Sequence, residues 1–256
     1  MRIGRRVGVG VAIVGSLRLA VSGAVPALAR TGPVARFARP AELRLANLAN
    51  GTSTGFGGWV FQPTVAATSV TAEFKLPAFT CTATNTAVAP TAVMYTGSSI
   101  TSAKFNAAGV ALECVSGSPA AGAVAEVDGA PSVASNALHV GDLMKATIVT
   151  SLSKTTATIA DLTAGHTFKF TKSGTGAASV QERIIDDSLV SGSTQLPVTK
   201  FGKISFSAGA VGGKPLGSVT PNAAVNMETT AKVLQILTGP LTGTKLNAFL
   251  TTWKHS

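Results

Sequence analysis

Carboxylates are the side chains of this sequence best suited to acid–base chemistry, and two of them are placed together. Glu182 and Asp186 are four residues apart in an alternating segment, so a strand would present both on one face with Ile184 between them. Asp187 would point the other way, together with Arg183. Two carboxyl groups on one face can serve acid–base catalysis when burial separates their pKa values. The same spacing also describes a solvated pair on an outer face, which is the interpretation that these residues favour on their own.

Other familiar catalytic patterns are missing from the sequence. No GxSxG motif marks a serine hydrolase, and the only Gly-x-Gly of the first residues, Gly8-Val9-Gly10, lies in an apolar leader rather than in a phosphate-binding loop. The histidines and cysteines do not have the spacing of metal ligands. We therefore expect no metal site and no cofactor. The three histidines are scattered along the chain, at His139, His166 and His255.

The first 29 residues have the pattern of a secretory signal peptide. Three arginines among the first six residues precede an apolar run that ends with small residues at Ala27 and Ala29, the positions that signal peptidase requires. The alternative is a membrane anchor, but several glycines and Arg18 make the run too weakly apolar for a stable span. We expect the protein to be secreted. Residues 30–54 are then a flexible basic spacer or a pro-segment, and residues 55–256 form the folded domain.

The basic character of the chain lies mainly in this N-terminal part. The formal net charge is +10 and the pI is about 10.1, but eight of the 21 basic residues and only one acid precede residue 45. The remainder has 13 basic and 10 acidic residues, a net charge of only +3. A basic stripe with interleaved aromatic residues, which nucleic-acid binding would need, is not found. We expect no nucleic-acid partner.

The sequence has two cysteines, Cys81 and Cys114, and the compartment decides whether they are expected to form a disulfide. In an oxidising compartment they would form a disulfide that closes a loop of about 34 residues and contributes about 3 to 4 kcal/mol to stability. The alternative is two buried free thiols. Export favours the disulfide.

Short alternating segments dominate the chain from residue 55 onward and predict an all-β fold. Charged residues are only 12% of the sequence, while 27 glycines and many Ala, Thr, Ser and Val favour short strands joined by tight turns. About a dozen strands and no helical stretch predict a two-sheet antiparallel β-sandwich or jelly roll. The expected strands are Gly58–Gln62, Ser69–Leu76, Thr91–Tyr95, Gly109–Cys114, Gly122–Val127, Lys145–Ser151, Thr155–Ala160, His166–Thr171, Ser179–Asp186, Gly202–Phe206, Ala223–Met227, Lys232–Leu237 and Asn247–Thr252.

A series of segments in the same order resembles the glutamic peptidase (eqolisin) family of secreted acid endopeptidases. The resemblance extends from Gly55 to Trp253 and includes TGFGGWVFQPTVAATSVTAEFKLPAFTC, CTATNTAVAPTAVMYTG, KFNAAGVALEC, AGAVAEVDGAP, ASVQERIIDD, LPVTKFGKISFSAGAVGGKPLG and NAFLTTW. The resemblance implies a β-sandwich like that of the legume lectins and a disulfide between the two cysteines. It also implies a polypeptide substrate or ligand in a cleft.

The family's chemistry depends on a Gln and a Glu that hold a water against the scissile carbonyl. The carboxylate is the general base, and the amide orients the water and stabilises the oxyanion. In this sequence the Gln position falls on Ala107, with Asn106 available if the alignment shifts by one residue. The Glu position falls on Asp186, whose side chain is one methylene shorter, and the acid retained from a cleft strand is Glu126. An error of about 1 Å in such a site costs on the order of a hundredfold in rate.

Fewer aromatic residues are present at the positions that line the cleft in the family. The family's Trp positions fall on Phe56 and Ala92, and an Asp position falls on Thr96. Together with the altered dyad, this predicts a secreted, monomeric, catalytically degenerate member, a pseudoenzyme that binds through its old cleft. One alternative is an active acid endopeptidase that uses Asp186 with Asn106 or Glu126. Another is a carbohydrate-binding sandwich, which would need exposed aromatic rings.

Overall fold

Strands make up most of the described part of the chain. The computed structural model describes residues 36–37, 51–81, 85–97, 103–134, 138–173, 179–191 and 193–255. The predicted signal peptide, residues 1–29, lies outside the described residues. A short 3-10 helix, η3 (Leu216–Ser218), interrupts the strands. The strands are β1 (Arg36–Phe37), β2 (Gly51–Ser53), β3 (Phe56–Phe61), β4 (Ser69–Lys75), β5 (Thr86–Thr96), β6 (Lys104–Val115), β7 (Ser118–Val127), β8 (Ala130–Ala134), β9 (Leu143–Ser151), β10 (Lys154–Asp161), β11 (His166–Ser173), β12 (Ser179–Asp187), β13 (Leu189–Ser191), β14 (Thr194–Gln195), β15 (Lys203–Val211), β16 (Lys214–Pro215), β17 (Asn222–Glu228), β18 (Leu234–Thr238) and β19 (Phe249–Trp253).

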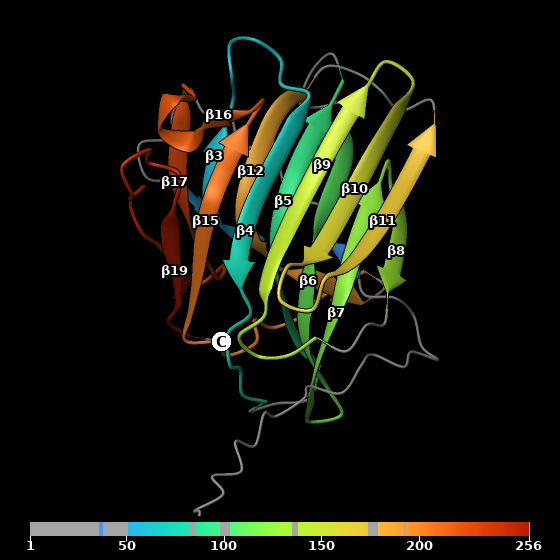
Figure 1. Ribbon diagram of the computed structural model, residues 1–256. Helices are drawn as coiled ribbons and strands as arrows, with labels where there is room; N and C mark the ends of the chain where they lie inside the picture. Colours follow the sequence, from blue (N-terminus) through green and yellow to red (C-terminus); the bar gives the residue numbers. More distant parts are fainter. Residues whose placement is uncertain are drawn as a thin grey trace, which may run out of the picture.

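The main strands form two layers joined at one side. The hydrogen-bonded order is β11-β10-β9-β4-β15-β19-β18-β17-β3-β12-β5-β6-β7-β8. In Figure 1, β15, β4, β9, β10 and β11 form a front layer across β12, β5, β6 and β7, and β17 and β19 lie at the side where the ladder passes from one layer to the other. Contacts between β4 and β5 and between β10 and β7 join the layers. The predicted antiparallel β-sandwich is confirmed.

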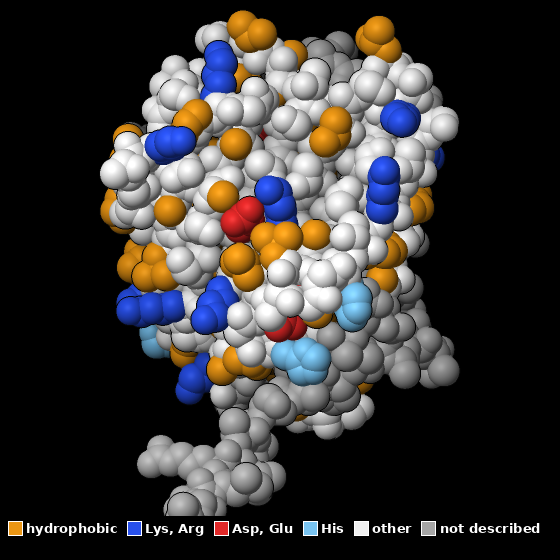
Figure 2. All heavy atoms as spheres, viewed as in Figure 1, with side chains coloured by type: hydrophobic (Ala, Val, Ile, Leu, Met, Phe, Trp, Pro, Cys, Tyr) orange, Lys and Arg blue, Asp and Glu red, His pale blue; other side chains and the backbone are white. Residues whose placement is uncertain are grey.

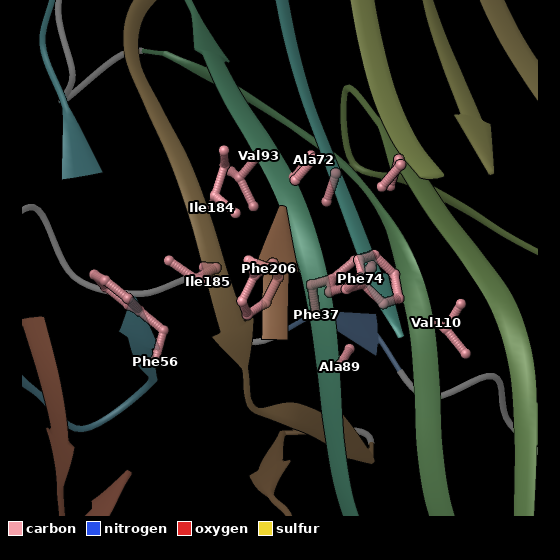
Figure 3. Close-up of a cluster of buried hydrophobic side chains, with 14 of the residues drawn as sticks. Phe37, Phe56, Ala72, Phe74, Ala89, Val93, Val110, Ile184, Ile185 and Phe206 are labelled. Carbon is pink, nitrogen blue, oxygen red and sulfur yellow. The ribbon is translucent and has the colours of Figure 1, made fainter. Parts of the chain in front are cut away.

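Aromatic and aliphatic side chains fill the space between the layers. Phe206 of β15 stacks on Phe249 of β19, with ring centroids 4.7 Å apart, and its ring lies 5.8 Å from that of Phe74 of β4. Figure 3 shows Phe74 and Phe206 in the same buried cluster as Ile184 of β12. Alternation places these side chains inward because every second residue of a strand points to the same face.

The front layer turns its other face to solvent. Along β4, buried Val70, Ala72 and Phe74 alternate with less buried Thr, Glu and Lys. Figure 2 shows this side of the molecule as scattered lysines, a few acids and small apolar groups, with no concentration of one charge. This surface contains none of the predicted catalytic residues, which belong to the back layer.

Most strands predicted from alternation are found, but several extend beyond their predicted bounds. The predicted strands Thr91–Tyr95 and Gly109–Cys114 are the centres of β5 and β6, which are 11 and 12 residues long. Both are buried over nearly their whole length, so their sequences lack the apolar–polar alternation that marks a half-exposed strand. The short strands β8, β13, β14 and β16 were not predicted.

Two parts of the predicted N-terminal spacer are strands. β1 pairs with β13, with Arg36 opposite Val190 and Phe37 opposite Leu189. β2 runs parallel to β17, with Gly51 opposite Val225. The remaining residues of the spacer up to residue 50 lie outside the described residues, and the boundary at residue 54 stays a prediction.

The predicted disulfide is present. Cys81, in the segment that follows β4, is bonded to Cys114 of β6, with Cα atoms 5.5 Å apart. The bond therefore links the segment after a front-layer strand to the back layer. In the part of the chain that the structure describes, no helix has the length and apolarity to cross a membrane.

Candidate functional site

Strand β12 presents its polar residues on two opposite faces. Glu182 lies opposite Phe61 and Met94 in the neighbouring strands, whereas Arg183 lies opposite Val60 and Val93. Residues directly opposite one another in an antiparallel pair point to the same side of the sheet. Glu182, Ile184 and Asp186 therefore share one face of the back layer, and Gln181, Arg183, Ile185 and Asp187 share the other.

The face with Glu182 and Asp186 is turned toward the rest of the sandwich, and we call it the inner face. The hydroxyl of Thr251 in β19 lowers the pKa of the Asp186 carboxyl, in opposition to burial. Gly57, directly opposite Asp186, is so close to β18 that an added Cβ would lie 2.9 Å from Ile236 Cγ2. The face with Arg183 and Asp187 is the outer face. There Phe37 of β1 packs against Phe105 of β6, with ring centroids 6.0 Å apart.

The strand register brings two of the predicted site residues together on the outer face. Ala107 of β6 lies directly opposite Glu126 of β7 on one side and Val93 of β5 on the other. Val93 in turn lies opposite Arg183. The row Arg183–Val93–Ala107–Glu126 therefore crosses four strands on one face. The predicted Gln position and the retained acid are neighbours.

Asp186 and Asn106 do not belong to this row. Asn106 is opposite Met94, which is opposite Glu182, so its side chain is on the inner face. Asp186 is on that face as well, but it is opposite Pro90, four residues along β5 from Met94. The structure therefore brings Asp186 together with neither Ala107 nor Glu126. The carboxyl of β12 that shares the outer face with Glu126 is Asp187.

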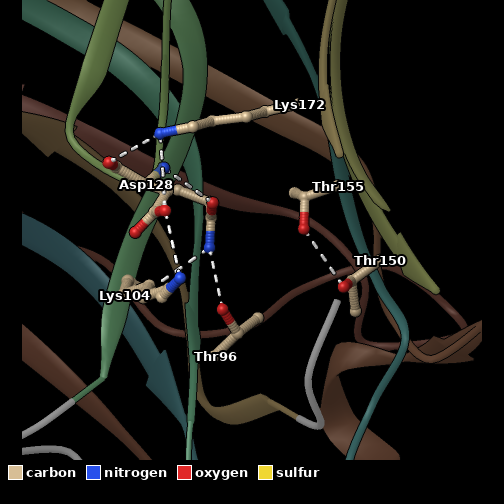
Figure 4. A network of polar contacts seen from close by, with 7 residues as sticks. Thr96, Lys104, Asp128, Thr150, Thr155 and Lys172 are labelled. Atoms are coloured by element: carbon tan, nitrogen blue, oxygen red, sulfur yellow. Dashed lines mark hydrogen bonds and ion pairs between the residues drawn. The ribbon is translucent and has the colours of Figure 1, made fainter. Parts of the chain in front are cut away.

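Asn106 has a structural environment. Its Nδ2 donates to the Met94 carbonyl and to Thr96 Oγ1, both at 3.2 Å, and its Oδ1 accepts from the Asp128 backbone N–H, also at 3.2 Å. Figure 4 shows the surrounding network, in which Lys104 and Lys172 converge on Asp128. The amide thus joins β6 to β5 and to the turn between β7 and β8, and these bonds leave it turned away from the outer face.

Arg183 is the centre of the outer face. Its side chain is fully buried, and its guanidinium carbon lies 4.6 Å from the ring centroid of Phe56 and 4.5 Å from that of Tyr95. Nε and Nη2 both donate to Gln181 Oε1, at 2.8 and 2.6 Å. Nη1 has no hydrogen-bond partner. Stacking between aromatic rings stabilises a cation that has left water, by about 2 kcal/mol or more per desolvated contact.

Asp187 and Glu126 give this face its acidic groups. Burial raises the pKa of Asp187 well above its usual range, Arg183 lowers it in part, and the charge of Glu126 raises it. A backbone hydrogen bond from Ser188 also lowers the pKa of Asp187 in part. Burial also lowers the pKa of Arg183, which Tyr95 and Asp187 partly oppose. The outer face thus holds one cation and two interacting acids.

The inner face has a different electrostatic character. Burial raises the pKa of Glu182 to about 7, with a small opposing effect of the Ser179 hydroxyl, and burial raises the pKa of Asp186 to about 7. In the described part of the chain neither carboxyl forms an ion pair with a Lys, Arg or His side chain. A carboxyl group in such surroundings is protonated in mild acid and costs free energy when ionised.

The aromatic residues that a sugar-binding site would need are already in contact with other groups. Arg183 covers one face of Tyr95, and Lys200 Nζ lies 5.4 Å from the ring centroid of Trp253. Trp59 stacks on Phe61 and donates its Nε1–H to the Gly239 carbonyl.

The sequence indicated only part of this arrangement. Alternation correctly separated Glu182 and Asp186 from Arg183 and Asp187, but it did not show which pair shares a face with Ala107. The role of Tyr95 and of Gln181 beside Arg183 was not predicted, and their spacing gives no signal for it. Among the described residues, no group of three or more His, Cys, Asp and Glu is placed to hold a metal ion.

Comparisons with known proteins agree with this fold. The family model of the Peptidase A4 family matches residues 54–244. The structure is similar to that of scytalido-glutamic peptidase with a transition state analog inhibitor, with a TM-score of 0.62 and 15% identity over 78% of this chain and 98% of that one. It is also similar to SCP-B, a member of the Eqolisin family in a complex with the tripeptide Ala-Ile-His, with a TM-score of 0.62 and 16% identity over 78% of this chain and 98% of that one.

A third similar structure is that of aspergilloglutamic peptidase from Aspergillus niger, with a TM-score of 0.52 and 19% identity over 66% of this chain and 99% of that one. A search of curated protein sequences finds no match. At these identities the structural similarity concerns the fold.

Proposed function

Because this chain belongs to the Peptidase A4 family, the glutamic peptidases or eqolisins, we propose that it is an exported member that binds a polypeptide on its outer face without hydrolysing it. Family membership confirms the resemblance found in the sequence. Binding of a peptide inhibitor or a peptide by the similar structures supports a polypeptide as the ligand. The outer face of β12, β5, β6 and β7 is the surface that we assign to it.

The buried guanidinium of Arg183 is the observation that carries this proposal. A glutamic peptidase needs an amide and a carboxylate that together hold a water. On the outer face the position of the family Gln is Ala107, which has no amide. The amide that the face does contain, Gln181, accepts two hydrogen bonds from Arg183 at its carbonyl oxygen, so that oxygen is not available to orient a water.

Export and a monomeric state are further parts of the proposal. The N-terminal arginines, the apolar run and the small residues at Ala27 and Ala29 support export. The Cys81–Cys114 disulfide is consistent with an oxidising compartment.

Cleavage of denatured casein by the purified full chain, measured from pH 2 to pH 7, tests the loss of hydrolysis. We expect no turnover above the buffer blank while circular dichroism shows a folded protein. A variant that restores the family residue, Ala107→Gln, is the matched comparison. Turnover by the unaltered chain would contradict the proposal.

A second function is favoured by one specific observation, the interaction between Asp187 and Glu126 on the outer face. Two carboxyl groups whose pKa values are separated can divide the roles of general acid and general base in an acid endopeptidase. In that case casein cleavage would be lost in Asp187→Asn and retained in Asp186→Asn, because Asp186 is on the inner face. If any turnover were found, the same pair of variants would identify which of the two carboxyl groups is catalytic.

A further inference from the structure

Acidic and basic side chains differ in burial throughout the domain. Of the ten acids from residue 45 onward, seven are buried: Glu113, Glu126, Asp142, Asp161, Glu182, Asp186 and Asp187. All twelve lysines are exposed or half-buried. The sequence of this part has a net charge of only +3, but the surface that it forms presents twelve lysines and three acids.

Two of the three surface acids are already paired with lysines. Lys145 Nζ lies 3.2 Å from Glu73 Oε1, and Asp128 Oδ2 lies 3.1 Å from Lys104 Nζ and 3.4 Å from Lys172 Nζ. The other nine lysines form no ion pair with an acid in the part of the chain that the structure describes. Unpaired charges of one sign on a surface attract a partner of the opposite sign. The surface is therefore suited to an anionic partner.

Every strand of the front layer has a lysine on its solvent side, and we call this surface the front face. The five lysines are Lys203 of β15, Lys75 of β4, Lys145 of β9, Lys154 of β10 and Lys169 of β11. Cross-strand pairing and alternation place them on one side of the layer. Neighbouring strands lie about 4.8 Å apart, so the five strands span about 20 Å. Figure 2 shows lysines spread over this side of the molecule, which suits an extended polymer better than a small anion.

Hydroxyl groups occupy much of the remaining front face. Thr71, Thr147 and Thr158 lie in one row across β4, β9 and β10, and the row ends at Lys169 of β11. The hydroxyls of Thr71 and Thr147 are 2.9 Å apart and share a hydrogen bond. A hydroxyl can both donate and accept hydrogen bonds, so such a row can bond to the hydroxyl groups of a sugar.

The front face lacks the groups that other polyanions need. Among the described residues it has no aromatic side chain and no arginine, because Phe168 and Phe170 of β11 point to the other side and pack against the core. Nucleic-acid recognition relies on arginine and, for single strands, on stacked aromatic rings. Binding at a membrane surface relies on large apolar side chains that enter the lipid. Lysines and hydroxyls alone favour a charged carbohydrate.

We propose that the front face binds an acidic polysaccharide, whose repeated anionic groups contact the lysines of successive strands while its hydroxyl groups bond to the threonines between them. The front face and the outer face of β12 are on opposite sides of the sandwich. The inference thus goes beyond the proposed binding of a polypeptide and does not depend on it.

Calorimetric titration of the full chain with polygalacturonate at pH 6 tests the inference, and uncharged dextran is the neutral control. We expect polygalacturonate to bind in 50 mM NaCl and dextran not to bind. Raising NaCl to 500 mM should weaken the binding by about tenfold or more, because salt screens exposed charges. Duplex DNA and phosphatidylglycerol vesicles, compared at equal charge concentration, should bind at least about tenfold more weakly.

Two variants of equal net charge locate the binding surface. The front variant replaces three unpaired lysines of the front face: Lys75→Gln, Lys169→Gln and Lys203→Gln. The control variant replaces three exposed lysines in the segments that follow β17, β18 and β19: Lys232→Gln, Lys245→Gln and Lys254→Gln. The front variant should bind polygalacturonate about tenfold more weakly, and the control variant within about twofold of the unaltered protein. Thermal melts should be nearly unchanged, because all six side chains are exposed.

Several results would overturn the inference. Equal losses in the two variants would show that the charge of the whole molecule attracts the polymer. Full affinity in the front variant would assign the binding to another part of the chain, such as the arginine-rich N-terminal segment. Binding of DNA or vesicles as tight as that of polygalacturonate would reject a polysaccharide as the partner, and the absence of polygalacturonate binding would reject the surface altogether.

Discussion

The two faces of strand β12 carry similar polar side chains in different surroundings. On the inner face, Glu182 and Asp186 are two acids without a cation, and only hydroxyl groups offset their burial. On the outer face, Asp187 is accompanied by Arg183, by aromatic rings and by a hydrogen-bonded glutamine. Adjacent residues of one strand thus differ in charge compensation because they face different layers.

This difference separates groups suited to ligand binding from groups that adjust stability. The inner acids are enclosed between two layers of strands and can respond only to protons. The outer groups are covered in part by Phe37, which belongs to a two-residue strand. A chemical function for β12 is therefore expected from Arg183 and Asp187, and a pH-dependent stability from Glu182 and Asp186.

The largest effect that we expect is a loss of stability as the pH rises from about 4 to about 7. Glu182 and Asp186 have pKa values of about 7 in the folded protein, against 4.5 and 3.8 as model values. Between these values the folded state holds protons that the unfolded state releases, so the free energy of unfolding falls with rising pH. At about 1.4 kcal/mol per pKa unit, each carboxyl accounts for about 3 to 4 kcal/mol. Urea unfolding at pH 4 and pH 7.5 measures the difference.

Replacing both inner acids by amides should remove the part of this pH dependence that Glu182 and Asp186 cause. The double variant Glu182→Gln, Asp186→Asn has no proton to release at these positions, although the contribution of Asp187 remains. Glu73→Gln is the control, since Glu73 lies on the solvent face of β4 in an ion pair with Lys145. Equal stability of the unaltered protein at both pH values would contradict the assignment of the inner face.

The next effect concerns the cation of the outer face. Arg183→Ala should lower the free energy of unfolding by about 3 kcal/mol, because it leaves a cavity between Phe56 and Tyr95 and removes the contacts of a fully buried side chain. Arg183→Met should cost less than about 1.5 kcal/mol, since methionine fills a similar volume and contacts aromatic rings well. Denaturant unfolding at pH 5 measures both variants.

The comparison of these two variants is informative in itself. A small loss in Arg183→Met shows that the charge is not required for folding, which is expected of a residue kept for a ligand. If Met costs as much as Ala, the guanidinium is a structural group and its interaction with Asp187 and Gln181 stabilises the fold.

The fold could be predicted from alternation because most strands are half buried. Segments such as Ser69–Leu76 and His166–Thr171 have one apolar and one polar face, and both are strands in the structure. β5 and β6 were predicted too short because both of their faces are covered, and the β1 pairing was missed because two residues carry no periodicity.

The site was harder to predict because successive side chains of a strand point to opposite faces of the sheet. An alignment error of one position moves a side chain to the opposite face. The family Glu position was placed on Asp186, and its neighbour Asp187 is the acid that shares a face with Ala107 and Glu126. Sequence patterns gave the two faces of β12 correctly, but only pairing with β5, β6 and β7 shows which face belongs with Glu126.

A moderate loss of stability is expected when Asn106 is replaced. This substitution tests whether the amide of Asn106 is structural or catalytic. Asn106→Ala should lower the free energy of unfolding by about 2 kcal/mol, since it leaves the buried Thr96 hydroxyl and the Asp128 N–H without their partner. Thr96→Val removes only one of these bonds and should cost about 1 kcal/mol. Any casein turnover found in the parent should be unchanged in both variants at a temperature where they are folded. Loss of turnover in folded Asn106→Ala would show that the amide of Asn106 takes part in catalysis.

The smallest effect is expected on the solvent face of the front layer, where a charged pair lies far from both faces of β12. Lys145 Nζ is 3.2 Å from Glu73 Oε1 across the β4–β9 pair, and both side chains remain partly exposed. Exposed pairs contribute about 0.5 kcal/mol or less because water and salt screen them. Lys145→Gln should therefore change the free energy of unfolding by no more than this, and less at 0.5 M NaCl. A larger change would mean that charge compensation stabilises this protein even in contact with solvent, and the contrast between the two faces of β12 would then reflect more than burial.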